Sequence, residues 1–292
     1  MMALPRIGAL GLLLLILAGC GPATTGPVRP GDETMGADRQ ALALLEQLPG
    51  RYSETRLAGV ERNLLSLSVR PEPSVDQLQP RLRITQRQTG QPDRDFLLTF
   101  LVDQPSSALG EIAAEFAPVG ADGQVRARCP MRFAARREGL SGQTDPANCN
   151  FGGTALLKEI AFDGATLVIA DRVMSWPEAE PVADDQVHEF RPVRRYSGWA
   201  GVRDGDDWRV ATAIELESDL EPLEPVDAGG MGLDFEVRLG HYRSAPGSDP
   251  ILRMEVTDAE SGRLVGYAWA DPEATSLGFA NHQIQIGLTA RP

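Results

Sequence analysis

The feature that most constrains this chain is an apolar pattern with a period of two residues, which recurs along most of its length. Leu65, Leu67 and Val69, for example, alternate with polar residues. Further segments of this kind, or short apolar runs, lie at 82–84, 96–102, 112–116, 131–135, 154–162, 166–170 and 187–193. Side chains alternate between the two faces of a strand, so the pattern predicts β-strands. Many short strands, two of them joined by the turn Asp163-Gly164, predict a mainly β protein closed into an antiparallel barrel.

One segment departs from this period. Ala41, Leu44, Leu45 and Leu48 recur at helical spacing, so a single amphipathic helix is expected at 38–48. The strand pattern continues downstream, with strands expected at 207–216, 232–243, 251–258, 263–270 and 283–290 and a loop at 218–231. This second series predicts a small antiparallel β domain.

Charge separates the two parts of the chain. The formal net charge is −13, but residues 1–196 hold 24 acidic and 21 basic side chains, whereas 197–292 hold 17 and 7. We therefore predict a barrel domain at 38–196 and an acidic β-rich domain at 197–292. An acidic chain does not suit nucleic-acid binding, which needs a surplus of basic residues. Arginine supplies 27 of the 28 basic residues, and Lys158 is the remaining one.

The N-terminus has the pattern of a bacterial lipoprotein signal. Arg6 precedes an apolar stretch at 7–17 that is too short to span a bilayer, and Leu17-Ala18-Gly19-Cys20 resembles a lipobox. We expect a signal peptide at 1–19, lipidation of Cys20 and a flexible tether at 20–37. Because Gly21 rather than Asp follows Cys20, sorting to the outer membrane, facing the periplasm, is expected. The alternative is an ordinary cleaved signal with a chance cysteine.

Cys129 and Cys149 remain once Cys20 is assigned to the lipid anchor. An even pair of cysteines in an oxidising compartment predicts a disulfide, while a catalytic thiol or half of a metal site are the alternatives. His188, His241 and His282 are far apart and lack the spacing of metal ligands, so no metal site is expected.

The segment 129–172 carries the most specific pattern. Cys129-Pro130-Met131 opens it, followed by Gly142, Thr144, Pro146, Cys149, Thr154, Glu159 and Asp171-Arg172. In this order and spacing the sequence resembles the T-type phycobilin chromophore lyases, the CpcT/CpeT family. The segments 50–53, 70–71 and 92–94 add to the resemblance, which covers roughly 38–195.

The resemblance implies a calycin-like antiparallel barrel that attaches an open-chain tetrapyrrole, a bilin, to a cysteine of a phycobiliprotein. It implies that Asp171 contacts the pyrrole nitrogens and donates a proton, that Arg94 pairs a propionate, and that Arg172 contributes to the binding site. Glu159 is implied as a second catalytic carboxylate beside them. Asp93, Phe96, Val173 and Ala155 stand where the family has Tyr, Arg, Gly and Tyr, and the segment after Arg172 lacks the family's Trp-Gly and aromatic ending.

Each of these residues also has a simpler interpretation. Asp171-Arg172 fits a salt-bridged strand end, and Arg94 fits a solvated loop. Lys158 and Glu159 should face opposite sides of one strand. Arg126, Arg128, Arg132 and Arg136 share one parity and fit an outer polar face, with an anion-binding stripe as the alternative. Trp199, Trp208 and Trp269 fit core or rim positions.

The sequence as a whole favours an envelope lipoprotein whose barrel binds a small apolar or tetrapyrrole-like ligand, or a partner protein. An active bilin lyase and a structural assembly lipoprotein are the two alternatives. No cofactor is required, a bilin is the candidate ligand, and the expected partners are the membrane at Cys20, a small molecule and an envelope protein. Phosphate-binding loops, nucleophile elbows and dinucleotide fingerprints do not occur.

Overall fold

The computed structural model describes residues 43–58, 64–73, 79–101, 111–136, 139–151 and 153–292. The expected signal peptide and tether, Cys20 and the first residues of the expected helix lie outside this part of the chain. Residues 43–47 are helical, in agreement with the second half of that helix. No helix in the described ranges combines the length and the apolar character needed to cross a bilayer.

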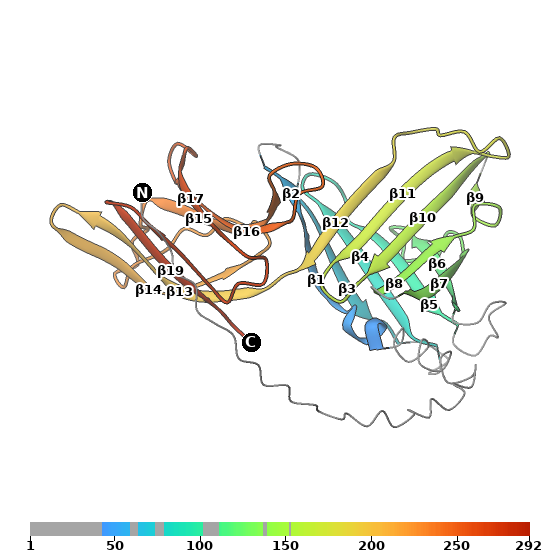
Figure 1. The fold of residues 1–292 in the computed structure, drawn as a ribbon, viewed down its shortest axis with the longest axis horizontal. Helices are drawn as coiled ribbons and strands as arrows, with labels where there is room; N and C mark the ends of the chain where they lie inside the picture. The colour runs from blue at the N-terminus through green and yellow to red at the C-terminus, as the bar shows by residue number, and fades with distance from the viewer. Residues whose placement is uncertain (1–42, 59–63, 74–78, 102–110, 137–138, 152) are drawn as a thin grey trace, which may run out of the picture.

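A closed antiparallel barrel forms the N-terminal part of the described chain (Figure 1). Its ten strands are β1 (Gly50–Glu54), β3 (Leu65–Pro71), β4 (Arg81–Gln88), β5 (Arg94–Phe100), β6 (Glu111–Val119), β7 (Cys129–Arg136), β8 (Gly139–Thr144), β10 (Thr154–Phe162), β11 (Leu167–Ser175) and β12 (Gln186–Pro192). They are ordered β11-β12-β1-β3-β4-β5-β6-β7-β8-β10, and pairing of β10 with β11 closes the ring. The short strand β9 (Asn150–Phe151) adds to the edge of β10.

The period of two explains what fills the barrel. On β3, Leu65, Leu67 and Val69 are buried, while Ser66 and Ser68 between them are less so. The same alternation on the other strands produces one core cluster that runs from Leu45 to Phe190. The barrel is therefore a packed core along much of its length rather than an open tube.

Two four-stranded sheets form the rest of the described chain. One contains β13 (Arg195–Asp204), β14 (Asp207–Glu217), β18 (Ser276–Ala280) and β19 (Ile284–Ala290). The other contains β15 (Phe235–Arg243), β16 (Ile251–Asp258), β17 (Leu264–Ala270) and β2 (Arg56–Leu57). A second cluster of buried residues, from Tyr196 to Leu288, belongs to these sheets and is separate from the barrel core.

The junction between the barrel and these sheets refines the expected boundary. β13 begins at Arg195, so a boundary at 196/197 would cut this strand near its start. The segment between β12 and β13, 193–194, is the better place for it. In addition, β2 follows β1 in the chain but pairs in parallel with β15, so an N-terminal segment contributes an edge strand to the C-terminal sheet.

Candidate functional site

A partly buried ion pair lies inside the barrel, on the adjacent strands β10 and β11. Lys158 and Asp171 are direct partners in the antiparallel register, so their side chains share a face. Lys158 Nζ lies 2.5 Å from Asp171 Oδ1. The lysine side chain is 4% exposed and the aspartate side chain 34% exposed, so Asp171 lies between the ammonium group and solvent.

Two stacked aromatic rings contact the same ammonium group from across the barrel. Lys158 Nζ lies 5.2 Å from the ring centre of Phe96 and 5.0 Å from that of Phe116. These rings stand on β5 and β6, which are not neighbours of β10 in the sheet, so the contact crosses the interior. The rings stack on each other with centroids 5.3 Å apart. The two rings thus form an apolar wall beside the ammonium group.

Thr144 fixes the backbone that carries the lysine. Its hydroxyl accepts a hydrogen bond from the Lys158 amide at 2.8 Å and donates one to the Leu156 carbonyl at 2.9 Å. The backbone pairing between β8 and β10 begins only at Glu159. The Thr144 side chain therefore supplies a hydrogen bond to Lys158 that the backbone of β8 does not. These two hydrogen bonds hold the backbone of β10 at Lys158 and so help to fix where its side chain begins.

Burial dominates the electrostatics of the pair. It lowers the pKa of Lys158 below its usual value, because a charged amine loses hydration inside the barrel. Asp171 opposes this by its charge and hydrogen bond, and the nearby positive charge of Arg94 lowers the pKa of Lys158 further. Arg94 is thus close enough to the pair to act on it, although Arg94 begins β5 at the barrel end.

The barrel end that holds Arg94 opens on a cavity of about 1000 Å³. Barrel residues in its wall include Glu54, Gln86, Arg94, Gln186 and His188, and the C-terminal sheet contributes Arg238, Tyr242 and Glu255. Gln186 is the register partner of Asp171 on β12, which places the ion pair next to this wall. His188 Nδ1 lies 2.7 Å from Glu54 Oε1 at the same end. We call this space, with Arg94 and the Lys158–Asp171 pair beside it, the mouth site.

The structure brings together some of the residues expected from the sequence and separates others. Asp171 and Arg94 belong to the mouth site. Arg172 instead lies on the outer face, where it pairs with Asp185 at 2.8 Å. Glu159 is exposed on the outer face of β10, so the expectation that it stands beside Asp171 is wrong. The cause is strand parity, since neighbouring residues on a strand point to opposite faces.

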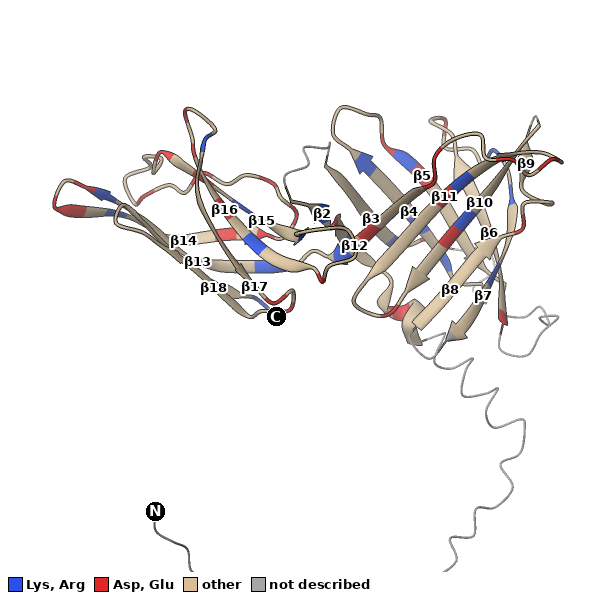
Figure 2. Ribbon diagram, turned by 45° about the horizontal axis from the view of Figure 1, so that its top comes forward, with Lys and Arg blue, Asp and Glu red and all other residues tan. Residues whose placement is uncertain are grey.

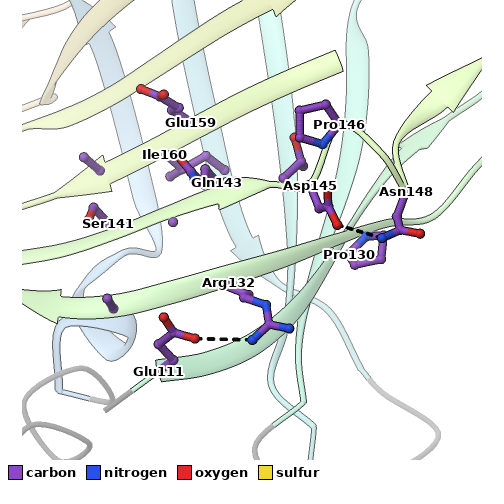
Figure 3. A pocket seen from close by; sticks show the side chains of 14 residues that line it. Glu111, Pro130, Arg132, Ser141, Gln143, Asp145, Pro146, Asn148, Glu159 and Ile160 are labelled. Atoms are coloured by element: carbon purple, nitrogen blue, oxygen red, sulfur yellow. Dashed lines mark hydrogen bonds and ion pairs between the residues drawn. The ribbon is translucent and has the colours of Figure 1, made fainter. Parts of the chain in front are cut away.

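Glu159 lines a different hollow, a groove of about 660 Å³ on the outside of the barrel wall. Figure 3 shows the ion pair between Glu111 and Arg132 and the hydrogen bond between Asp145 and Asn148 at this groove. Arg126 and Arg128 are likewise paired on the outside, with Asp122 and Glu115. These pairs support the outer polar face rather than an anion-binding stripe. Figure 2 shows basic and acidic residues interspersed over the barrel strands.

The remaining expected residues are also placed. The sulfur atoms of Cys129 and Cys149 are bonded to each other, and both residues are buried in the barrel core. Trp199, Trp208 and Trp269 are all exposed, so a core position is wrong for each of them. Among the described residues, no group of three or more His, Cys, Asp or Glu side chains could hold a metal ion.

Sequence reasoning did not assign a role to Lys158, Glu54 or His188. A signal for Lys158 was present, because it is the one lysine in a chain of 27 arginines and follows the inward parity of Leu156 and Ile160. Glu54 and His188 gave no such signal, because their meeting depends on the pairing of β1 with β12.

No protein-family model matches the chain, and no curated protein is significantly similar to it.

Proposed function

We propose that the barrel is the ligand-binding part of an envelope lipoprotein and that it holds an elongated amphipathic small molecule bearing carboxylates at the mouth site. The observation that carries the proposal is that Arg94 and Gln186 line a cavity of about 1000 Å³, and that Gln186 is the register partner of Asp171, which is paired with Lys158. Small-molecule sites are concave and combine apolar walls with a few convergent polar groups. The mouth site is concave, but its wall is mostly polar, and the apolar surface nearest to it is that of Phe96 and Phe116, whose rings contact Lys158.

An open-chain tetrapyrrole is the lead ligand. Its long conjugated body suits a barrel mouth, its propionates suit the forked guanidinium of Arg94, and its pyrrole N–H groups suit the carboxylate of Asp171. The resemblance of 38–195 to the CpcT/CpeT family, and the calycin-like barrel it implies, point to the same ligand class. Lipidation at Cys20 would hold the barrel at the periplasmic face of the outer membrane, with the acidic β domain beside it.

We propose binding rather than bond formation as the activity. A lyase of the expected kind would use Glu159 near Asp171, but Glu159 faces the outer groove. Phe96 stands where the family pattern has an arginine. Arg94 is therefore the basic residue that this segment contributes to the mouth site. A carboxylate and a single forked donor are enough to orient a ligand.

A titration of the full chain, purified in detergent, with biliverdin tests this function. Saturable binding at roughly tens of micromolar or tighter, with a red shift of the bilin absorption, is expected. Arg94→Gln should weaken binding by about tenfold to a hundredfold, because it removes a charge-assisted hydrogen bond to a propionate. Asp171→Asn should abolish the red shift.

A matched control comes from the same strand as Lys158. Glu159→Gln changes the charged residue next to Lys158 but on the outer face. This variant should bind biliverdin as the unaltered chain does. An absence of any spectral change with the unaltered chain would contradict the tetrapyrrole proposal, and equal losses in all three variants would contradict the placement of the ligand at the mouth site.

A further inference from the structure

The single lysine of this chain is more buried than any arginine that the structure describes. Every other basic residue is an arginine, whose guanidinium does not lose its proton in proteins. Lysine differs in that its amine can become neutral and act as a nucleophile when it is desolvated. The chain thus places its one amine side chain inside the barrel, and the side chain is 4% exposed.

The surroundings of Lys158 are those of an activated amine. Burial lowers the pKa of the group, which increases the neutral fraction. Asp171 is in direct contact, at 2.5 Å, and can take up and return a proton. The rings of Phe96 and Phe116 supply an apolar wall at 5.2 and 5.0 Å. One carboxylate, which can act first as a base and then as an acid, and an apolar surface therefore converge on the Lys158 nitrogen atom.

We propose that Lys158 forms an imine with an apolar, conjugated aldehyde that enters the barrel through the mouth site. This covalent activity goes beyond the reversible binding proposed above and does not depend on it, since a bilin carries no aldehyde. Asp171 would both activate the amine and serve as the counter-ion of the product.

The reaction balances within these groups. The Lys158 ammonium passes one proton to Asp171, and the neutral amine adds to the carbonyl carbon, forming the C–N bond of a carbinolamine. The hydroxyl group of that intermediate leaves as water with the proton held by Asp171. The product is a protonated imine on Lys158 that is paired with the Asp171 carboxylate, and one water molecule is released for each aldehyde consumed.

All-trans-retinal is a suitable probe, because it is an apolar conjugated aldehyde whose protonated imine absorbs to the red of the free compound. The folded full chain would be mixed with retinal near neutral pH, reduced with cyanoborohydride, digested and mapped by mass spectrometry. Lys158 is the only lysine in the sequence, so a lysine side-chain adduct can form at this residue alone. The reference is the same chain unfolded in urea.

We expect a reduced retinyl adduct on Lys158 with a yield about tenfold or more above that of the unfolded chain, because the folded chain desolvates the amine and holds Asp171 and an apolar wall beside it. Before reduction, Asp171→Asn should shift the absorption of the imine to the blue, because without the carboxylate counter-ion the imine loses its proton near neutral pH. Lys158→Met and Lys158→Arg should both abolish the side-chain adduct. Lys158→Arg keeps the positive charge, so it guards against a loss caused by misfolding of the methionine variant.

The result that would overturn the proposal is a folded chain with no adduct on Lys158, with an adduct confined to the N-terminal amine, or with a yield no higher than in urea. The biliverdin titration distinguishes this failure from failure of the proposed function. Bilin binding without a retinyl adduct would refute the imine alone, and an adduct without bilin binding would refute the tetrapyrrole proposal alone.

Discussion

The ion pair between Lys158 and Asp171 makes a quantitative prediction about coupling between the two side chains. Removing one partner of a fully buried pair costs about 3–5 kcal/mol. Exposed pairs are worth at most about 1 kcal/mol. Solvent reaches Asp171, at 34% exposure, but hardly reaches Lys158, at 4%. We therefore expect an intermediate coupling energy of about 1–3 kcal/mol.

The perturbation is a double-mutant cycle of Asp171→Asn and Lys158→Met. Asp171→Asn alone leaves a buried ammonium group without its carboxylate. In the Lys158→Met background there is no such charge, so the same substitution should cost less by the coupling energy. Urea unfolding followed by circular dichroism measures the four free energies. Tryptophan fluorescence is a second probe. Trp176 provides its signal from the barrel part of the chain, since the other three tryptophans lie downstream of residue 195.

The same cycle has a pH dependence with a defined sign. Burial lowers the pKa of Lys158 in the folded chain, so the unfolded chain binds this proton more tightly. The free energy of unfolding contributed by Lys158 therefore rises with pH between its folded pKa and the unfolded value of 10.5. Asp171 raises the pKa of Lys158 in the folded chain, so this rise should start at a lower pH in Asp171→Asn.

The cycle also defines the result that would refute the reasoning. If the free-energy costs of the two single substitutions add up to that of the double variant within about 0.5 kcal/mol, the two side chains have no charge interaction in the folded state.

Two further predictions concern other buried groups. Peptide mapping without reductant should show a cross-link between Cys129 and Cys149, and its reduction should destabilise the barrel by about 3 kcal/mol, whereas two free thiols would contradict the pairing. Burial lowers the pKa of His241 to about 4 from 6.5, so the unfolded chain takes up this proton first as the pH falls. The free energy of unfolding should then fall from pH 6.5 to about 4, by up to about 3 kcal/mol. Urea unfolding in this range should show a flatter dependence for His241→Gln, and an unchanged slope would exclude His241 as its source.

The sequence predicts a strand well where its apolar residues alternate over several positions. The strand expected at 251–258 is observed with the same bounds, and the hairpin at Asp163-Gly164 joins β10 and β11 as expected. β11 runs on to Ser175 rather than ending at residue 170, because polar residues continue it. A period-two search for apolar residues stops at Asp171, although that side chain continues the inward face.

Strands rich in glycine escape such a search. β8 contains Gly142, where a Cβ atom would lie 2.5 Å from the Phe133 ring of the neighbouring strand. β13 contains Gly198, where a Cβ would lie 1.8 Å from the Gly287 carbonyl oxygen. At both positions the strand needs a residue without a side chain because its neighbour occupies the space. Glycine is depleted in strands generally, so local propensity argues against strands that tertiary packing requires.

The candidate site was predictable only in part, for a similar reason. Asp171 and Arg94 could be named because short motifs carry them. The error over Glu159 came from treating nearness in sequence as nearness in space, although strand parity places it on the opposite face from Lys158. The meeting of Lys158 with Phe96 and Phe116 depends on closure of the barrel, and no local pattern contains that information.

The charge difference between the two parts of the chain acquires a physical meaning at their junction. Arg51 of β1 pairs with Glu217 and with Asp219, the latter at 2.9 Å, so acidic groups of the C-terminal part neutralise a barrel arginine. Arg243 of β15 reaches the other way, to Glu189 of β12, at 2.5 Å.

The pair of Arg243 with Glu189 joins β15 to β12, and the pairs of Arg51 join β1 to the end of β14 and the residues after it. β15 and β16 also supply Arg238, Tyr242 and Glu255 to the cavity wall of the mouth site. The acidic part therefore forms one wall of the cavity at the mouth site as well as being a neighbour of the barrel. Loosening the junction should then weaken ligand binding even where every barrel residue of the mouth site is intact, since the cavity needs both of its walls.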